Sequence, residues 1–421
     1  MAWGISGNTA SRGGGRSDPG GTRMVLSQHG RHERKPRSGR VVLAAAAVVV
    51  VAGAVVAGIL LTRGGGNPTT AASTSSSNET GAGGAGRTGG GTASGSSTRA
   101  PTSSASSSSA AASPSPAKSL ATPVAGAVLT VGGSPLFAQV SPDGSFVYIT
   151  DPKSGTVLRL DTATDRVTKT IRIPQGPPRF VSFSPDGRQA YVSVYTANYS
   201  ANYVDYLDTG TDTVTKAVRV GKGPYAVQCS PDGRRLYVPN YAEPRMEVID
   251  IASAKVIGAI PEEPDPHWIA FADNGRYGYT TNHFSDVVTQ IDLRTDKVVR
   301  TIPVGDGPHS IEAAPDDARL GLVNYIAGSV SIIDPSRNIV VATIPDVGKN
   351  PQDITYAPDG RHLYTANSND GTVTVIDTAT NTVTARVRTG NSPTSVTVLP
   401  NGQKAYVTNF DDGTIRILKT A

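Results

Sequence analysis

SPDGRRLYVPN, residues 230–240, is the stretch that decides the fold, because six variants of it recur along the chain. The variants begin at Ser141, Ser184, Ala272, Ala314, Ala357 and Leu399. The second position of the Asp-Gly turn advances in steps of 43, 46, 42, 42, 43 and 42 residues. A period of about 42 residues is typical of architectures built by repeating one supersecondary unit.

Residues 224–260 show what one repeat contains. PYAVQCS and RRLYVPN alternate between apolar and polar residues on either side of a Pro-Asp-Gly turn, which predicts a β-hairpin. MEVIDI and KVIGAI are two further short runs of the same kind. Four strands form a small antiparallel sheet whose faces are too apolar to stand alone, and radial stacking of such sheets gives a β-propeller. After residue 123 no segment has the sustained 3.6-residue apolar period of a helix.

The sequence therefore predicts an all-β fold, a seven-bladed β-propeller over residues 123–421. The last repeat supplies only three strands before the sequence ends, SPTSVTVL, KAYVTNF and TIRILKT. AGAVLTVGG, residues 125–133, resembles the fourth strand of the other repeats. We expect this N-terminal strand to close the last blade, pairing residues 127–131 with residues 414–419 and removing free sheet edges.

The residues before the propeller divide into three segments. Residues 1–40 carry eight Lys and Arg against two acidic residues, which predicts a cytoplasmic tail. Residues 41–62 begin with 21 apolar residues, a length that spans roughly 30 Å, and predict a transmembrane signal-anchor helix. Residues 63–122, rich in Gly, Ser and Thr, predict a disordered linker. We expect a single-pass cell-membrane protein with its propeller outside the cytoplasm; a cleaved, secreted form is the alternative.

The charge of the chain is divided unevenly between these segments. Residues 123–421 contain 27 basic and 31 acidic residues, a net charge of −4, although the whole chain has a pI of about 9.2. The basic character thus belongs to the tail, and we expect no nucleic-acid partner. The single cysteine, Cys229, lies in an inner strand and is predicted to be a buried, inert thiol.

The end of each second strand carries a resemblance to a known family. Four repeats end this strand on YVTN (406–409), YVPN (237–240), YTTN (279–282) and YTAN (364–367). Together with VIDTAT (375–380) and VGKGP (220–224), these motifs make residues 123–421 similar to the YVTN-repeat family of bacterial and archaeal cell-surface β-propellers. The resemblance implies a fold and an envelope location, but it names no site.

One face of the predicted ring gathers the candidate functional residues. The loops that enter the inner strands and those between second and third strands open on the same face, here called the top face; the Pro-Asp-Gly hairpins form the bottom face. On the top face, blades 2 to 5 carry a one-sided arc of Arg, Tyr and His. The predicted ligand-binding residues are Arg179, Tyr195, Tyr199, Tyr225, Tyr241, His267, His283, His309 and Tyr325.

Such an arc is typical of a recognition surface, because Tyr and Arg combine large contact area with hydrogen-bonding tips. We therefore predict a monomeric binding module for an envelope protein or glycan, rather than an enzyme. No catalytic residue and no cofactor are assigned. The binding hypothesis requires an exposed, Tyr-rich groove on the blade 2–5 face.

The histidines leave one enzymatic alternative open. His267, His283 and His309 fall in neighbouring blades, and three imidazoles can hold a divalent metal with an open position. Seven-bladed streptogramin lyases share the predicted architecture, and that resemblance implies His near the channel together with a divalent metal. A metal-dependent lyase or hydrolase is thus the alternative function, and it requires the three rings to converge.

Overall fold

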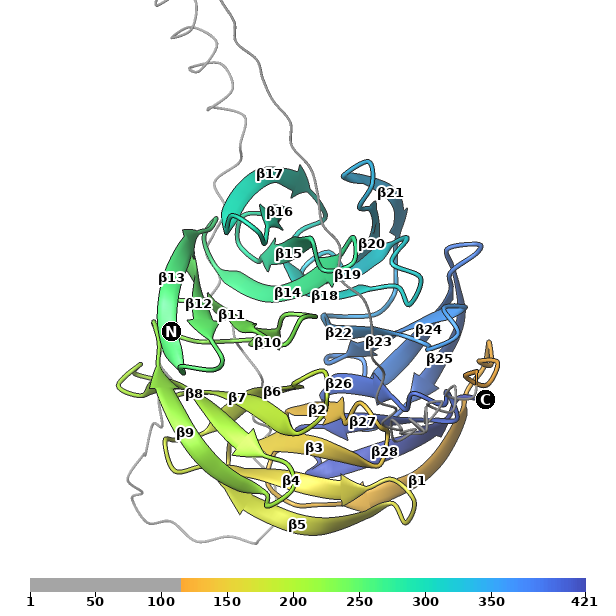
Figure 1. Cartoon of the computed structure of the whole chain (residues 1–421). Coiled ribbons are helices and arrows are strands. Elements are labelled where there is room, and N and C mark those ends of the chain that lie inside the picture. The colour runs from red at the N-terminus through yellow and green to blue at the C-terminus, as the bar shows by residue number, and fades with distance from the viewer. Residues whose placement is uncertain (1–114) are drawn as a thin grey trace, which may run out of the picture. The chain divides into compact units, whose positions relative to one another are not determined.

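The computed structural model describes residues 115–421, and all their regular elements are β-strands (Figure 1). None of these residues belongs to a helix long and apolar enough to cross a bilayer. The predicted tail (1–40) and signal-anchor (41–62) lie outside the described residues, as does the predicted linker up to residue 114.

Twenty-eight strands form seven four-stranded antiparallel sheets, each of which is one blade. Blade 1 contains β2 (Phe137–Val140), β3 (Phe146–Asp151), β4 (Thr156–Asp161) and β5 (Arg166–Arg172). Blade 2 contains β6 (Pro178–Phe183), β7 (Gln189–Tyr195), β8 (Asn202–Asp208) and β9 (Thr213–Arg219). Blade 3 contains β10 (Gln228–Cys229), β11 (Arg235–Asn240), β12 (Arg245–Asp250) and β13 (Lys255–Pro261). Blade 4 contains β14 (Pro266–Ala272), β15 (Tyr277–Asn282), β16 (Val287–Asp292) and β17 (Lys297–Pro303).

Blades 5 and 6 repeat this order. Blade 5 contains β18 (Pro308–Ala313), β19 (Leu320–Asn324), β20 (Ser329–Asp334) and β21 (Ile339–Ile344). Blade 6 contains β22 (Pro351–Tyr356), β23 (His362–Asn367), β24 (Thr372–Asp377) and β25 (Thr382–Arg388). Blade 7 combines β26 (Pro393–Val398), β27 (Lys404–Asn409) and β28 (Thr414–Lys419) with β1 (Val124–Thr130).

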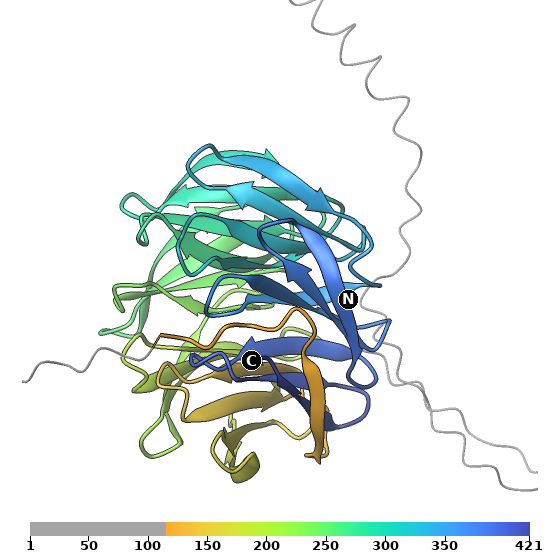
Figure 2. The same cartoon turned by 90° about the vertical axis from the view of Figure 1, so that its right-hand side faces the viewer.

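Blade 7 closes the ring as the sequence predicts. Strand β1 pairs antiparallel with β28 from Val124 opposite Lys419 to Thr130 opposite Thr414. Figures 1 and 2 show the orange N-terminal strand beside the blue C-terminal strand. The all-β, seven-bladed prediction is confirmed.

The Pro-Asp-Gly hairpins recur because each one fits against its neighbour. In blade 2, the Gly187 amide donates to the Ser184 carbonyl at 2.9 Å, and Gly187 has a φ of 69°. A Cβ at Gly275 of blade 4 would lie 3.0 Å from Pro231 of blade 3. Glycine therefore supplies both the left-handed turn and the space for the preceding blade's proline.

Buried tyrosines of the second strands connect neighbouring blades. In four blades the tyrosine hydroxyl reaches a side chain at the turn between the third and fourth strands of the next blade. The bonds are Tyr148–Asp212 (2.5 Å), Tyr237–Asp296 (3.0 Å), Tyr279–Asn338 (2.9 Å) and Tyr406–Asp165 (2.6 Å). The bond from Tyr406 joins blade 7 to blade 1, so it spans the point where the ring closes.

Blade 3 departs from the predicted pattern at its inner strand. PYAVQCS predicts a strand over residues 224–230, but β10 contains only Gln228 and Cys229. The cause is that the Ala226 amide donates to the His267 carbonyl of blade 4 at 3.2 Å, which diverts the chain from its own sheet. Cys229 is buried as predicted, and burial raises the pKa of its thiol to about 12.

Residues 115–121 form a strap across the bottom-face hairpins of blades 6 and 7, although the sequence assigned them to the linker. The Ser119 amide and hydroxyl donate to the Asp359 carboxylate at 2.7 and 2.8 Å. His362 Nδ1 lies 2.7 Å from the same hydroxyl. The Leu120 amide donates to the Thr420 carbonyl at 2.7 Å. The strap therefore attaches the residues that precede β1 to the bottom-face hairpins of blades 6 and 7.

Candidate functional site

The nine residues predicted on the top face converge into one cluster. The ring centroid of His267 lies 4.9 Å from that of His283, 5.0 Å from that of His309 and 4.8 Å from that of Tyr225. Tyr325 extends the cluster beyond His309, with 5.8 Å between ring centroids. Side chains from blades 2 to 5 thus meet at the channel.

The blade 2 side of this cluster is held by the extended loop between β7 and β8. The Tyr199 hydroxyl lies 2.6 Å from the Tyr241 hydroxyl, which links this loop to blade 3. The Arg179 guanidinium sits 4.4 Å from the centre of the Tyr195 ring, a cation–π contact. Burial raises the pKa of the Tyr195 and Tyr241 phenols, so both stay protonated at neutral pH.

The cluster fills the channel instead of lining a groove. His267, His283, His309, Tyr195 and Tyr325 are all buried. The opening beside them has a volume of about 20 Å³, room for roughly one water molecule. Tyr199, Tyr225 and Tyr241 are half-buried and their rings pack against one another, so the described top face gives the exposed Tyr-rich groove of the binding hypothesis no support.

The three histidines meet but do not form a metal centre. His267 Nδ1 lies 3.0 Å from the Asp265 carbonyl oxygen, and His309 Nδ1 lies 2.8 Å from the Gln352 carbonyl oxygen. The His309 Nε2 atom lies 3.4 Å from the Tyr225 hydroxyl. Within residues 115–421 no group of three His, Cys, Asp or Glu side chains is arranged to hold a metal ion. The geometry gives the metal alternative no support.

Three aromatic side chains form a floor below this cluster. The ring centroids of Phe137 and Phe180 are 3.9 Å apart, and Trp268 packs edge-on against both, at 5.3 and 4.6 Å. They project from the inner strands of blades 1, 2 and 4. The floor separates the top-face cluster from the rest of the channel.

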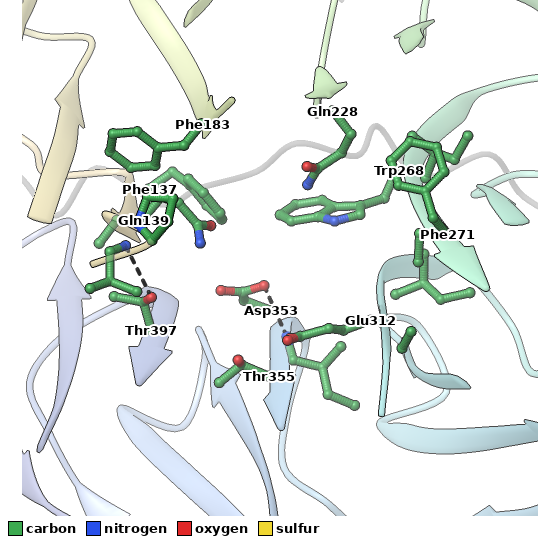
Figure 3. Close-up of a pocket in the computed structure, with 18 of the residues that line it drawn as sticks. Phe137, Gln139, Phe183, Gln228, Trp268, Phe271, Glu312, Asp353, Thr355 and Thr397 are labelled. Carbon is green, nitrogen blue, oxygen red and sulfur yellow. Dashed lines mark hydrogen bonds between the residues drawn. The ribbon is translucent and has the colours of Figure 1, made fainter. Parts of the chain in front are cut away.

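On the other side of the floor, a cavity of about 570 Å³ opens toward the bottom face (Figure 3). Its aromatic walls are Phe137, Phe183, Trp268 and Phe271, and bottom-face prolines, including Pro142 and Pro231, form its rim. This volume falls in the range of pockets that bind small organic molecules. The described residues thus place the larger opening on the face opposite the predicted site.

Two carboxyl groups lie in this cavity. Asp353 is 3% exposed and accepts hydrogen bonds from the Val396 amide and the Ser310 hydroxyl, at 3.0 and 2.9 Å. Burial raises its pKa to about 6. Burial also raises the pKa of Glu312 to about 8, and the neighbouring charge of Asp353 acts in the same direction. Among the described residues that line the cavity there is no Lys, Arg or His.

The polar lining also includes the side-chain amides of Gln139 and Gln228 and the hydroxyls of Thr355 and Thr397. Sequence reasoning missed these residues because it stopped at the residue after each inner-strand proline. A strand directs every second side chain to the same face. The positions two and four residues after those prolines include Phe137, Trp268, Asp353, Gln139, Gln228 and Glu312. The pairing register shifts between Pro266 and Trp268 and between Pro351 and Asp353, so the cavity-lining positions are out of phase with the residue that follows each proline.

Comparisons with known proteins agree with this architecture. Residues 212–319 match the YNCE-like beta-propeller family, and residues 326–421 match the cytochrome D1 heme domain. The hydrazine synthase of Kuenenia stuttgartiensis superimposes with a TM-score of 0.62 and 22% identity over 68% of this chain and 96% of that chain. The chain is a β-propeller. At this identity the structural likeness shows the fold alone, and no curated protein matches the chain.

The heme-domain match corrects one prediction. From the sequence we expected no cofactor, with a single divalent metal as the alternative. Residues 326–421 match a domain named for heme, and the group to which the comparison points is therefore heme. The no-cofactor prediction is contradicted by this finding.

Proposed function

We propose that this propeller is a binding module for a small organic molecule, held in the bottom-face cavity. The observation that carries the proposal is the cavity of about 570 Å³ with aromatic walls and a few converging polar groups. Pockets of this composition hold an apolar body while the polar groups fix its orientation. The aromatic floor closes the inner end, so a ligand enters and leaves through the bottom face.

The proposal is tested with a library of fluorinated fragments, followed by fluorine NMR on the full chain. Gln139→Trp places a bulky ring in the cavity from blade 1. Lys222→Trp, at an exposed position of the top-face loop that leads to blade 3, is the matched control. Fragments that bind the unmodified chain and the control should lose binding to Gln139→Trp. The proposal fails if no fragment distinguishes the two variants.

Heme, the group named by the matched domain, does not fit the described residues. Protein ligands of heme iron are His, Cys, Met or Tyr, and none of these residue types lines the large cavity. The top face offers imidazoles and phenols, but its opening of about 20 Å³ cannot admit a macrocycle. The one histidine in the matched segment, His362, lies against Ser119 of the strap. Heme therefore has no part in the function proposed for this cavity.

The cellular setting and a macromolecular partner are also proposals. A YVTN-type envelope protein anchored through residues 41–62 would carry this cavity outside the cytoplasm. Phe284 and Ile326, which are 53% and 46% exposed in the loops after β15 and β19, favour an envelope protein as a second, top-face partner.

A further inference from the structure

We propose that the cavity selects a cationic amine with an apolar body, its ammonium group held by Glu312 and Asp353 and its body by the aromatic walls. This inference rests on the proposed function, because it assigns a ligand class to the same cavity. It is carried by the uneven distribution of charge and of aromatic rings in the lining.

Two acidic side chains give the cavity its charge. Glu312 and Asp353 come from the inner strands of adjacent blades, β18 and β22, and Figure 3 shows both carboxyl groups near the centre of the cavity. Within residues 115–421 the lining contains no Lys, Arg or His to balance them. Asp353 already accepts bonds from Ser310 and Val396, which hold its carboxylate in place. A cation supplies the missing counter-charge, whereas an anionic ligand would be repelled.

The aromatic walls of the cavity indicate what the rest of the ligand would be. Trp268 and Phe271 project from β14, Phe183 lies on the opposite side of the cavity, and Phe137 packs against Trp268 at its inner end. Aromatic rings bind an apolar body and attract an adjacent ammonium through their negative faces. A bare metal cation would leave these walls without a partner. The lining therefore fits an amine attached to an aromatic or aliphatic group.

Two side-chain amides in the lining could add specificity for the ligand. Gln139 and Gln228 line the cavity, and among residues 115–421 neither side-chain amide makes a hydrogen bond to another residue. Each amide offers two donors and an acceptor. They provide polar contacts for a second, neutral group on the amine, at a distance from the carboxyl pair.

The experiment uses three probes that share an indole ring: tryptamine is a cation, tryptophol is neutral and indole-3-acetate is an anion. Isothermal titration calorimetry on the full chain at pH 8 should give tryptamine at least about tenfold tighter binding than either relative. Glu312→Gln should weaken tryptamine binding by about tenfold or more, because glutamine keeps the shape of the glutamate side chain but removes its negative charge. Tryptophol binding to the same variant should change little.

A second readout separates a charge effect from a change of shape. Tryptamine binding should weaken about tenfold between pH 8 and pH 6, where Glu312 becomes protonated. In Glu312→Gln this dependence should shrink. Glu263→Gln, at an exposed residue outside the cavity, should keep it.

The outcomes distinguish this inference from the proposed function. If tryptophol or indole-3-acetate binds as tightly as tryptamine and Gln139→Trp blocks it, the cavity binds small molecules but the amine inference is wrong. Unchanged tryptamine affinity in Glu312→Gln also overturns the inference. If none of the three probes binds, the inference fails, and the fragment experiment decides the proposed function separately.

Discussion

At the scale of single residues, the ring depends on hydroxyl groups that cross from one blade to the next. The Tyr406 hydroxyl donates to Asp165 at 2.6 Å, and Lys404 Nζ lies 2.8 Å from the same carboxylate. Asp165 therefore receives a phenol and an ammonium where blade 7 meets blade 1. Six blades carry a buried tyrosine at this strand position, and in four of them an acceptor in the next blade adds a hydrogen bond to the packing.

We expect Tyr406→Phe to destabilise the propeller by roughly 1–3 kcal/mol, because a hydrogen bond to a charged group is lost. Equilibrium unfolding in urea measures the change. Tyr364→Phe is the matched control, since the buried Tyr364 hydroxyl has no hydrogen-bond partner among the described residues. If Tyr406→Phe and Tyr364→Phe lower the free energy of unfolding equally, the phenol–carboxylate bond adds nothing to stability.

The cavity carboxyls should make stability depend on pH. The pKa of Glu312 is raised from an ordinary 4.5 to about 8, so between these values the folded state binds more protons than the unfolded state. Stability then falls as pH rises through this window, by up to about 1.4 kcal/mol per pH unit for one such group. Buried Asp353 adds to the fall at lower pH, up to about 6.

Glu312→Gln should remove this contribution, so the variant gains stability relative to the unmodified chain as pH rises from 5.5 to 7.5. Urea unfolding at these two pH values should show a relative gain of up to about 3 kcal/mol. Glu263→Gln, at an exposed position, is the control. If the difference in free energy of unfolding between Glu312→Gln and the unmodified chain does not change with pH, Glu312 ionises normally in the folded protein.

At the scale of elements, the strap and β1 together close the ring. The strap reaches a bottom-face hairpin aspartate, Asp359, that has a counterpart in blade 2, Asp186. Both aspartates accept a backbone amide within their own turn, but only Asp359 also binds Ser119. Asp186 also accepts a hydrogen bond from the Ser184 hydroxyl, a contact that Ala357 cannot make to Asp359, so the two positions differ in this local bond and in the strap.

Asp359→Ala should release the strap, whereas Asp186→Ala should affect only its own turn. Hydrogen exchange of the Leu120 amide, which bonds the Thr420 carbonyl, should become about tenfold faster or more in Asp359→Ala. The β4 amides of blade 1 should be unaffected. Slow exchange at Leu120 in that variant would show that the strap is held by its backbone bonds alone.

At the scale of the whole molecule, the sequence predicts the fold better than the site. The repeat period, the Pro-Asp-Gly turns and the displaced strand at residues 125–133 are local signals, and ring closure follows from them. The nine top-face residues also converge, because their positions in the repeat place them on one face. The burial of the three histidines, Tyr195 and Tyr325 was not predictable, since it depends on how rings from four blades pack at one point.

The cavity escaped prediction for a related reason. It exists because side chains such as Gln139 and Thr355 do not fill the channel, whereas Phe137, Phe180 and Trp268 cross it. Alternation shows which residues point inward, but volume and contact decide whether they meet. Likewise, the shortening of β10 results from a bond to the neighbouring blade. Neither effect is encoded in one repeat.

The closure of blade 7 also determines how the protein would respond to mechanical tension. The path along the backbone from residue 115 into the ring runs through the strap and β1, which lies at the outer edge of its sheet. A pull applied from that side is resisted first by Ser119 on Asp359 and then by the ladder between β1 and β28. Blades 1 to 6 contain no strand from outside their own repeat. Under load the molecule should therefore yield at the seam of blade 7, while the other six sheets remain intact.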